Sequence, residues 1–151
     1  MKEIIDDLIQ LTKSGKFDII AHGCNCFCVM NGGFAKQIKD NFLSAWSADQ
    51  KTEKGDYNKL GNYSFGVYNK VKIYNCYTQY NYGTDKVRLD YEALTLCLRK
   101  INFDNYTSSK ITIGLPKIGC GLAGGDWNIV KKIIEKELKD MDVTIINLKT
   151  K

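Results

Sequence analysis

The chain has 151 residues, of which 44% are hydrophobic and 26% are charged, and its formal net charge is +5. This length and composition suit one globular domain with a single hydrophobic core, so we predict one domain over residues 1–151. No window reaches the run of about eighteen apolar residues that a membrane span needs, and the N-terminus MKEIIDDLIQ does not have the pattern of a signal peptide. We therefore expect a cytoplasmic protein without membrane contact.

The charge pattern favours a small anionic partner. Lysines and arginines are scattered among acids without a basic tract, so no specific nucleic-acid binding is predicted. Six cysteines are present, and three of them alternate as Cys24, Cys26 and Cys28. Alternate residues of an extended segment point to opposite faces, and the chain has a single histidine, so we do not expect a zinc site. We predict reduced thiols and no cofactor.

The first half of the chain shows alternating strand and helix patterns. An apolar face at Phe34, Ala35, Ile38 and Phe42 has helical spacing, and we expect that helix to continue as far as Lys54. The elements expected here are a strand at 2–5, a helix or turn at 7–14, a strand at 17–21, a loop at 22–33, the helix at 34–54 and a polar loop at 55–61.

The second half continues the alternation. A turn at Asn69 and Lys70 joins two strand patterns and predicts a hairpin. The expected elements are strands at 63–69 and 71–77, a loop at 78–88, a helix at 89–101, a polar loop at 102–109, a strand at 111–115, a glycine-rich loop, a helix at 127–138 and a strand at 143–148. This order predicts an α/β domain with helices on both faces of a mostly parallel sheet.

Two segments place glycines between a strand and a helix. They are HGCNCFCVMNGGF, residues 22–34, and LPKIGCGLAGGDW, residues 115–127. Glycines let the backbone approach a ligand closely, and the free amides of a helix start donate to anions. Because ligands of open α/β sheets bind at the carboxyl ends of the strands, we expect both loops to wall one phosphate-binding cleft.

Several residues beside these loops have both a chemical and a structural interpretation. Asn25 can donate and accept at once, as recognition of a ribose diol requires, or it can form the turn at a strand end. His22 is the first candidate for proton transfer, although a half-buried structural histidine is the commoner outcome. Cys120 can be a nucleophile or a small residue that leaves room for a ligand, and we favour the second.

The aspartates divide in the same way. Asp7 can accept from an exocyclic amine or cap the following turn, and Asp126 is predicted to cap the helix that begins at Trp127. Asp85 and Asp90 flank the third loop and can act as general bases or remain solvated. Four aromatic residues can wall a base or a sugar, or pack in the core: Tyr77, Tyr80, Tyr82 and Trp127.

Together, the two loops resemble those of macro domains, which bind ADP-ribose. HGCNCFCVMNGGFAKQI resembles their first ligand loop and LPKIGCGLAGGDW their second, phosphate-binding loop, and the resemblance covers essentially the whole chain. The combination of His22, Cys24, Asn25 and Cys26 is most similar to the stand-alone ADP-ribose 1''-phosphate phosphatases. The resemblance implies a single macro domain over residues 1–151, with a three-layer α/β/α fold and a mixed, mostly parallel central sheet.

The resemblance also implies roles for single residues. Asp7 and the Leu8 amide would hold the adenine, and Asn25 would bind the distal ribose. His22 would be catalytic, and Asp90 is the nearest match for an assisting acid. The remaining implied binding residues are Cys24, Gly32, Gly33 and Phe34 in the first loop, and Ile118, Gly119, Cys120, Gly121 and Leu122 in the second.

Three functions remain open at this point: hydrolysis of ADP-ribose 1''-phosphate, removal of ADP-ribose from protein or nucleic acid, and binding of ADP-ribose without chemistry. A related branch that removes ADP-ribose uses a lysine and, in some members, an aspartate, where Gln79 and Ala123 stand here. We therefore expect the phosphatase activity, in a monomer that binds ADP-ribose or its 1''-phosphate and needs no metal.

Overall fold

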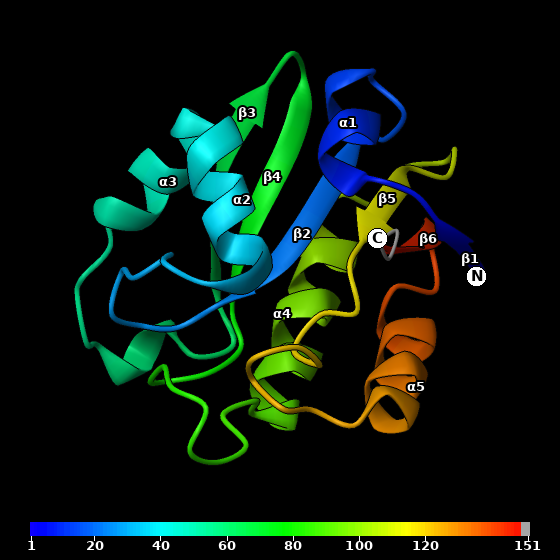
Figure 1. Ribbon diagram of the computed structural model, residues 1–151. Helices are drawn as coiled ribbons and strands as arrows, with labels where there is room; N and C mark the ends of the chain where they lie inside the picture. Colours follow the sequence, from blue (N-terminus) through cyan, green and yellow to red (C-terminus); the bar gives the residue numbers. More distant parts are fainter. Residues whose placement is uncertain (149–151) are drawn as a thin grey trace.

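The computed structural model describes residues 1–148, and Figure 1 shows their arrangement. Within these residues, six strands form one sheet in the order β1-β6-β5-β2-β4-β3. Neighbouring strands are parallel except β3 and β4, which form an antiparallel hairpin. The strands are β1 (Lys2–Ile5), β2 (Ile19–Cys24), β3 (Tyr63–Tyr68), β4 (Val71–Tyr77), β5 (Thr112–Leu115) and β6 (Asp142–Asn147). The helices are α1 (Leu8–Lys13), α2 (Gly33–Asn41), α3 (Leu43–Gln50), η1 (Tyr57–Lys59, a 3-10 helix), α4 (Tyr91–Asp104) and α5 (Trp127–Glu137).

Helices cover both faces of the sheet. Alternate residues of β2 separate the two sides of the core, because Ile19 and Ala21 pack with α4 and α5, whereas Ile20 packs with α1, α2 and α3. Figure 1 shows α4 and α5 side by side on one face of the sheet. The predicted three-layer α/β/α fold with a mixed, mostly parallel sheet is thus confirmed. No helix within residues 1–148 is long and apolar enough to cross a bilayer.

The helix predicted over residues 34–54 is two helices. α2 ends at Asn41 and α3 begins at Leu43, and the residue between them, Phe42, has φ −131° and ψ 84°. Its ring is buried and lies edge-on to Tyr68, with the ring centroids 5.1 Å apart. Ile38, Phe42 and Ala45 are all buried in one cluster, so the tertiary packing of both helices overrides the helical pattern at Phe42.

Strand β2 is longer than predicted. The sequence places its end at Ala21, but parallel pairing with β4 continues through His22, Gly23 and Cys24. His22 therefore lies inside the sheet opposite Asn75, where a polar side chain needs a partner. The predicted hairpin is confirmed, with positive φ at both Asn69 and Lys70, as its two-residue turn requires.

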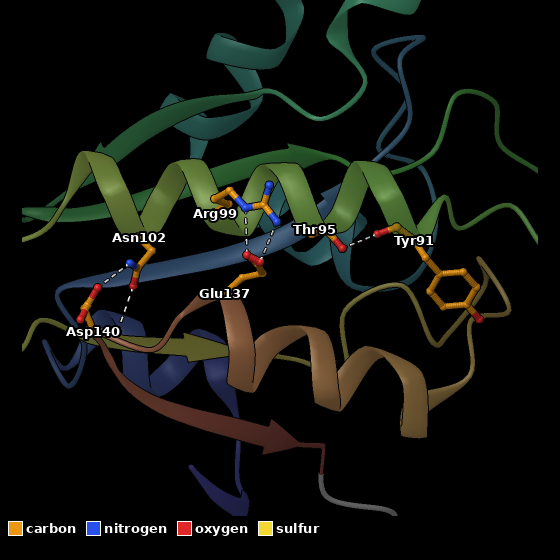
Figure 2. A network of polar contacts seen from close by, with 6 residues as sticks. All are labelled: Tyr91, Thr95, Arg99, Asn102, Glu137 and Asp140. Atoms are coloured by element: carbon orange, nitrogen blue, oxygen red, sulfur yellow. Dashed lines mark hydrogen bonds and ion pairs between the residues drawn. The ribbon is translucent and has the colours of Figure 1, made fainter.

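Figure 2 shows polar contacts between α4 and the C-terminal end of α5 with the turn that follows it. The Arg99 guanidinium donates to both carboxylate oxygens of Glu137, at 2.9 and 3.3 Å, and Glu137 is only 7% exposed. Farther along, Asn102 donates to the Asp140 carboxylate at 2.9 Å and accepts from the Asp140 amide. These contacts fix α5 on the sheet, and α5 in turn fixes the end of the second glycine loop.

Candidate functional site

The loops that follow β2, β4 and β5 wall one cavity of about 600 Å³. All three follow the carboxyl ends of neighbouring strands, which is where an open α/β sheet binds its ligands. The volume is in the range of small-molecule sites. Both predicted glycine loops therefore meet in one cleft, as the sequence suggested.

Asn25 shapes the first loop. Its Oδ1 accepts from the Phe27 amide at 2.9 Å, and its Nδ2 donates to the Val29 carbonyl at 2.8 Å. The side chain thus holds a turn at the strand end, the structural alternative considered for it. Asn25 also lines the cavity, so its contact with a ribose stays a prediction.

The N-terminus of α2 opens onto the cavity without a side-chain cap. Its N-cap residue is Gly32, and no side chain accepts from its first turn. Gly32, Gly33 and Phe34 all line the cavity. Free amides and the positive end of the helix dipole favour an anion at this position.

The glycines of the second loop have different roles. Gly119 has φ +74°, and a Cβ on it would lie 2.7 Å from Leu89. A Cβ on Gly125 would lie 2.6 Å from the Gly119 carbonyl oxygen, so both positions need glycine for the fold. A Cβ on Gly121 would meet no atom within 4 Å, and Gly121 lines the cavity. Gly121 is therefore the position where backbone and ligand can approach.

His22 forms part of the cavity wall and is held by Asn75. Asn75 Nδ2 donates to the Ala45 carbonyl and to Ser64 Oγ, so its Oδ1 faces His22 Nε2 as the acceptor, at 2.8 Å. Nε2 must then carry the proton, which leaves Nδ1 as an acceptor. Burial lowers the pKa of His22 from 6.5 to about 4, against the effect of the bond to Asn75. The imidazole is therefore neutral at pH 7, with its proton on Nε2 and none on Nδ1.

The thiols near the cavity are poor nucleophiles. Burial raises the pKa of Cys24 and of Cys120 above that of a free thiol. Cys120 Sγ instead contacts the Ile118 carbonyl at 3.5 Å. All six cysteines are unpaired. The raised pKa of Cys120 disfavours a nucleophilic role, so its role as a small residue that leaves room for a ligand stays the favoured prediction.

Three of the predicted site residues do not line the cavity. Asp7 caps α1 by accepting from the Gln10 amide at 3.2 Å, and Leu8 is buried in the core. Asp90 caps α4 by accepting from the Ala93 amide at 3.0 Å. These positions do not support the implied adenine contact or the assisting acid, which stay predictions without structural support. The predicted site residues that do line the cavity are His22, Cys24, Asn25, Gly32, Gly33, Phe34, Ile118, Gly119, Cys120, Gly121 and Leu122.

Other lining residues were not assigned from the sequence. Among the described residues, Lys117 is the only lysine or arginine in the cavity wall, and its ammonium lies 5.4 Å from the centre of the Trp127 ring. Its place in LPKIG, next to the glycines, is a signal that could have identified it. Gln79, Gly83 and Thr84 form the wall after β4, together with Tyr82, which the sequence analysis named as a candidate wall residue.

Comparison with known proteins agrees with this architecture. No family model matches the sequence. The chain is 36% identical over 155 residues to the "Uncharacterized 17.5 kDa protein in tk-vs intergenic region" of Enterobacteria phage T4, covering 97% of this chain and 96% of that protein. A Bacteroides thetaiotaomicron protein of unknown function has a similar structure, with a TM-score of 0.80, 26% identity and 97% of each chain covered.

Solved macrodomains are also similar in structure. The macrodomain of Thermus aquaticus DarG has a TM-score of 0.71 at 17% identity, covering 99% of this chain and 97% of that one. Thermosipho africanus DarTG in complex with ADP-ribose has a TM-score of 0.70 at 17% identity, covering 97% of this chain and 41% of that one. The chain therefore belongs to the family of the 17.5 kDa phage T4 protein, and its fold is that of a macrodomain.

Proposed function

We propose that this protein binds ADP-ribose in the cavity and hydrolyses the phosphomonoester of ADP-ribose 1''-phosphate to ADP-ribose and phosphate. The uncapped N-terminus of α2 carries this proposal, because it offers free amides to the same cavity that Gly121 and Lys117 line. Free amides, a helix dipole and an ammonium group suit a ligand with several negative phosphate oxygens. The ADP-ribose complex of the similarly folded Thermosipho protein supports this choice of ligand.

Neutral His22 is the proposed base. Nδ1 accepts a proton from the attacking water, whose oxygen bonds to phosphorus while the bond from phosphorus to the 1''-oxygen breaks. The 1''-oxygen leaves with a proton from solvent. The hydrogen bond from Nε2 to Asn75 leaves Nδ1 without a proton, and the Cys24 thiol lies beside it, with Sγ 3.8 Å from Nδ1. Asp90 has no part in the proposed step, because its carboxylate caps α4.

Two measurements on the wild type and on His22→Gln test the proposal. The glutamine amide can still donate to Asn75 but cannot take up a proton near neutral pH. We expect ADP-ribose affinities within about twofold of each other by calorimetry, and a loss of phosphate release of about a hundredfold or more in the variant. Absence of ADP-ribose binding by the wild type would refute the ligand. Binding without phosphate release would refute the phosphatase and leave a non-catalytic reader.

A second candidate is removal of ADP-ribose from a macromolecule. One observation favours it: the wall after β4 carries Tyr82, which lines the cavity and is 52% exposed, so this side is not closed by core packing. The turnover assay should therefore include ADP-ribosylated protein and ADP-ribosylated DNA beside ADP-ribose 1''-phosphate. Release of ADP-ribose from either, faster than phosphate release, would favour this second candidate.

A further inference from the structure

A thiol and a primary amine meet at the first glycine loop, outside the cavity wall. Lys59 is the last residue of η1, and its Nζ lies 3.6 Å from Sγ of Cys28. Neither side chain lines the cavity, and the two residues are far apart in the sequence. The fold therefore brings a nucleophilic thiol into contact with an amine that the proposed reaction does not use.

Lys59 is buried without a carboxylate partner. It is 7% exposed, its ammonium donates to the Cys26 carbonyl at 3.0 Å, and it lies 4.7 Å from the centre of the Tyr77 ring. Among the described residues, no ion pair includes Lys59. The buried Asp49 carboxylate accepts from the Tyr77 hydroxyl at 2.8 Å instead. A buried ammonium stabilises negative charge that develops on a neighbouring atom, and here that atom is Cys28 Sγ.

Cys28 is held in place and can still be reached from solvent. Its φ of +59° lies in the left-handed region, where residues other than glycine are uncommon. Gln50 Nε2 donates to its carbonyl at 2.9 Å, and its Sγ lies 3.3 Å from the Asp49 carbonyl oxygen. It is partly exposed, whereas four other cysteines are buried: Cys24, Cys26, Cys76 and Cys97. A small oxidant can therefore reach Sγ while the backbone keeps it beside Lys59.

The thiol nearest to Cys28 in the sequence has a different environment. Cys26 is fully buried, and its Sγ lies 3.5 Å from the Gln79 carbonyl oxygen. Oxidised Cys28 sulfur therefore has the Lys59 amine, and not the Cys26 thiol, as the nucleophile in contact with it.

We propose that Cys28 and Lys59 form a peroxide-sensitive modification site, in which oxidation joins Sγ to Nζ in a sulfenamide bond. In the first step, the Cys28 sulfur attacks an oxygen of hydrogen peroxide, and the S–O bond forms as the O–O bond breaks. The peroxide is reduced to water, and the thiol is oxidised to a sulfenic acid. In the second step, Nζ loses one proton to solvent and attacks the sulfur, and the S–N bond forms as the S–O bond breaks. The hydroxyl leaves as water with a second proton from Nζ.

The bond is reversible and lies away from the ligand. A dithiol such as dithiothreitol reduces the S–N bond to a thiol and an amine while it is itself oxidised to a disulfide. The bond ties the loop that carries Asn25 to η1 without entering the cavity. The modification therefore does not depend on the ligand proposed for that cavity.

The test treats the whole protein with hydrogen peroxide and measures its mass after free thiols are alkylated. We expect one cysteine fewer to be alkylated, a mass lower by two hydrogen atoms before alkylation, and a digestion product that joins the peptides of Cys28 and Lys59. Dithiothreitol should restore the starting mass. Lys59→Arg keeps the positive charge but lacks the amine, so the link should be lost and dimedone should label Cys28 as a sulfenic acid.

Three matched variants should keep the link: Cys26→Ser, Cys120→Ser and Lys54→Arg. Lys54 is exposed and Cys120 is the other partly exposed thiol, so these changes control for general reactivity. A disulfide between Cys26 and Cys28 would overturn the proposal, and so would a Cys28 sulfenic or sulfinic acid in the wild type without the link. Persistence of the mass loss in Lys59→Arg would overturn it as well. None of these readouts uses ADP-ribose, so their failure is distinct from failure of the proposed function.

Discussion

The burial of His22 should make the stability of this fold depend on pH. The side chain is 1% exposed, and its pKa falls from 6.5 to about 4 on folding. As the pH drops, His22 of the unfolded chain therefore takes up a proton before His22 of the folded chain does. The contribution of His22 to the free energy of unfolding is thus fully present above about pH 6.5 and is lost as the pH falls toward 4. With 1.36 kcal/mol per pKa unit, the loss is about 2 kcal/mol at pH 5 and roughly 3 kcal/mol at pH 4.

Urea unfolding of the wild type and His22→Gln at pH 7, 5 and 4 measures this loss. The carboxylates titrate in both chains, so their contribution cancels in the difference between the two free energies of unfolding. We expect that difference to move in favour of His22→Gln by about 2 kcal/mol between pH 7 and 5, and by roughly 3 kcal/mol between pH 7 and 4. Above about pH 6.5 the difference should be constant.

Parallel stability curves for the two chains would refute this reasoning. They would mean that His22 is charged or hydrated in the folded protein, and the assignment of Nδ1 as a free acceptor would fall with it. A change in the stability difference centred well above pH 6.5 would refute it too, because a pKa that folding lowers from 6.5 changes the stability only below about pH 6.5.

Three further substitutions test separate parts of the structure. Gly121→Glu places a carboxylate in the cavity, where it would repel a phosphate oxygen of the ligand by about 4 kcal/mol at about 4 Å and an effective dielectric of about 20. Calorimetry should therefore show an ADP-ribose affinity at least a hundredfold weaker than that of the wild type, with Gly121→Gln as the neutral control. Asp90→Ala should lower the free energy of unfolding by about 1 kcal/mol through the lost helix cap and leave turnover unchanged; reduced turnover would restore its catalytic role. Arg99→Met leaves the buried Glu137 carboxylate unpaired, so it should destabilise the protein by about 1 kcal/mol more than the double change to methionine; equal losses would show that the unpaired carboxylate costs nothing.

The fold could be predicted because local patterns and packing agree over most of the chain. Apolar runs at residues 111–115 and 143–148 are buried strands, and glycines follow strands where loops turn back. The sequence pattern gave the wrong element boundaries where contacts with residues distant in the sequence decide where a strand or a helix ends. β2 continues through His22 because β4 pairs with it, and the predicted helix is interrupted at Phe42, where α2 and α3 pack together on the same side of the sheet.

The site was predictable in its backbone and less so in its side chains. Clustered glycines can be recognised in a sequence because they allow positive φ angles and a close approach of the backbone to a ligand, and both glycine loops line the cavity. Asp126 was correctly predicted as a helix cap from the apolar helix that follows it, and its side chain accepts from Asn128. Asp90 also caps a helix, α4, which the sequence did not predict because the expected helix began at Leu89 and so included Asp90. Ring contacts among Phe27, Tyr57, Tyr80 and Tyr82 join segments that only the fold brings together.

The distribution of helix caps argues for the α2 N-terminus as the centre of the site. Aspartates cap α1, η1, α4 and α5, whereas α2 and α3 have no side-chain cap, and of these two only α2 contributes residues to the cavity wall. An aspartate at Gly32 would stabilise α2 by roughly a few tenths of a kcal/mol, but it would occupy the free amides and place a negative charge in the cavity. A missing cap at the helix that faces the cavity is what a bound anion requires, and it separates this helix start from the capped ones.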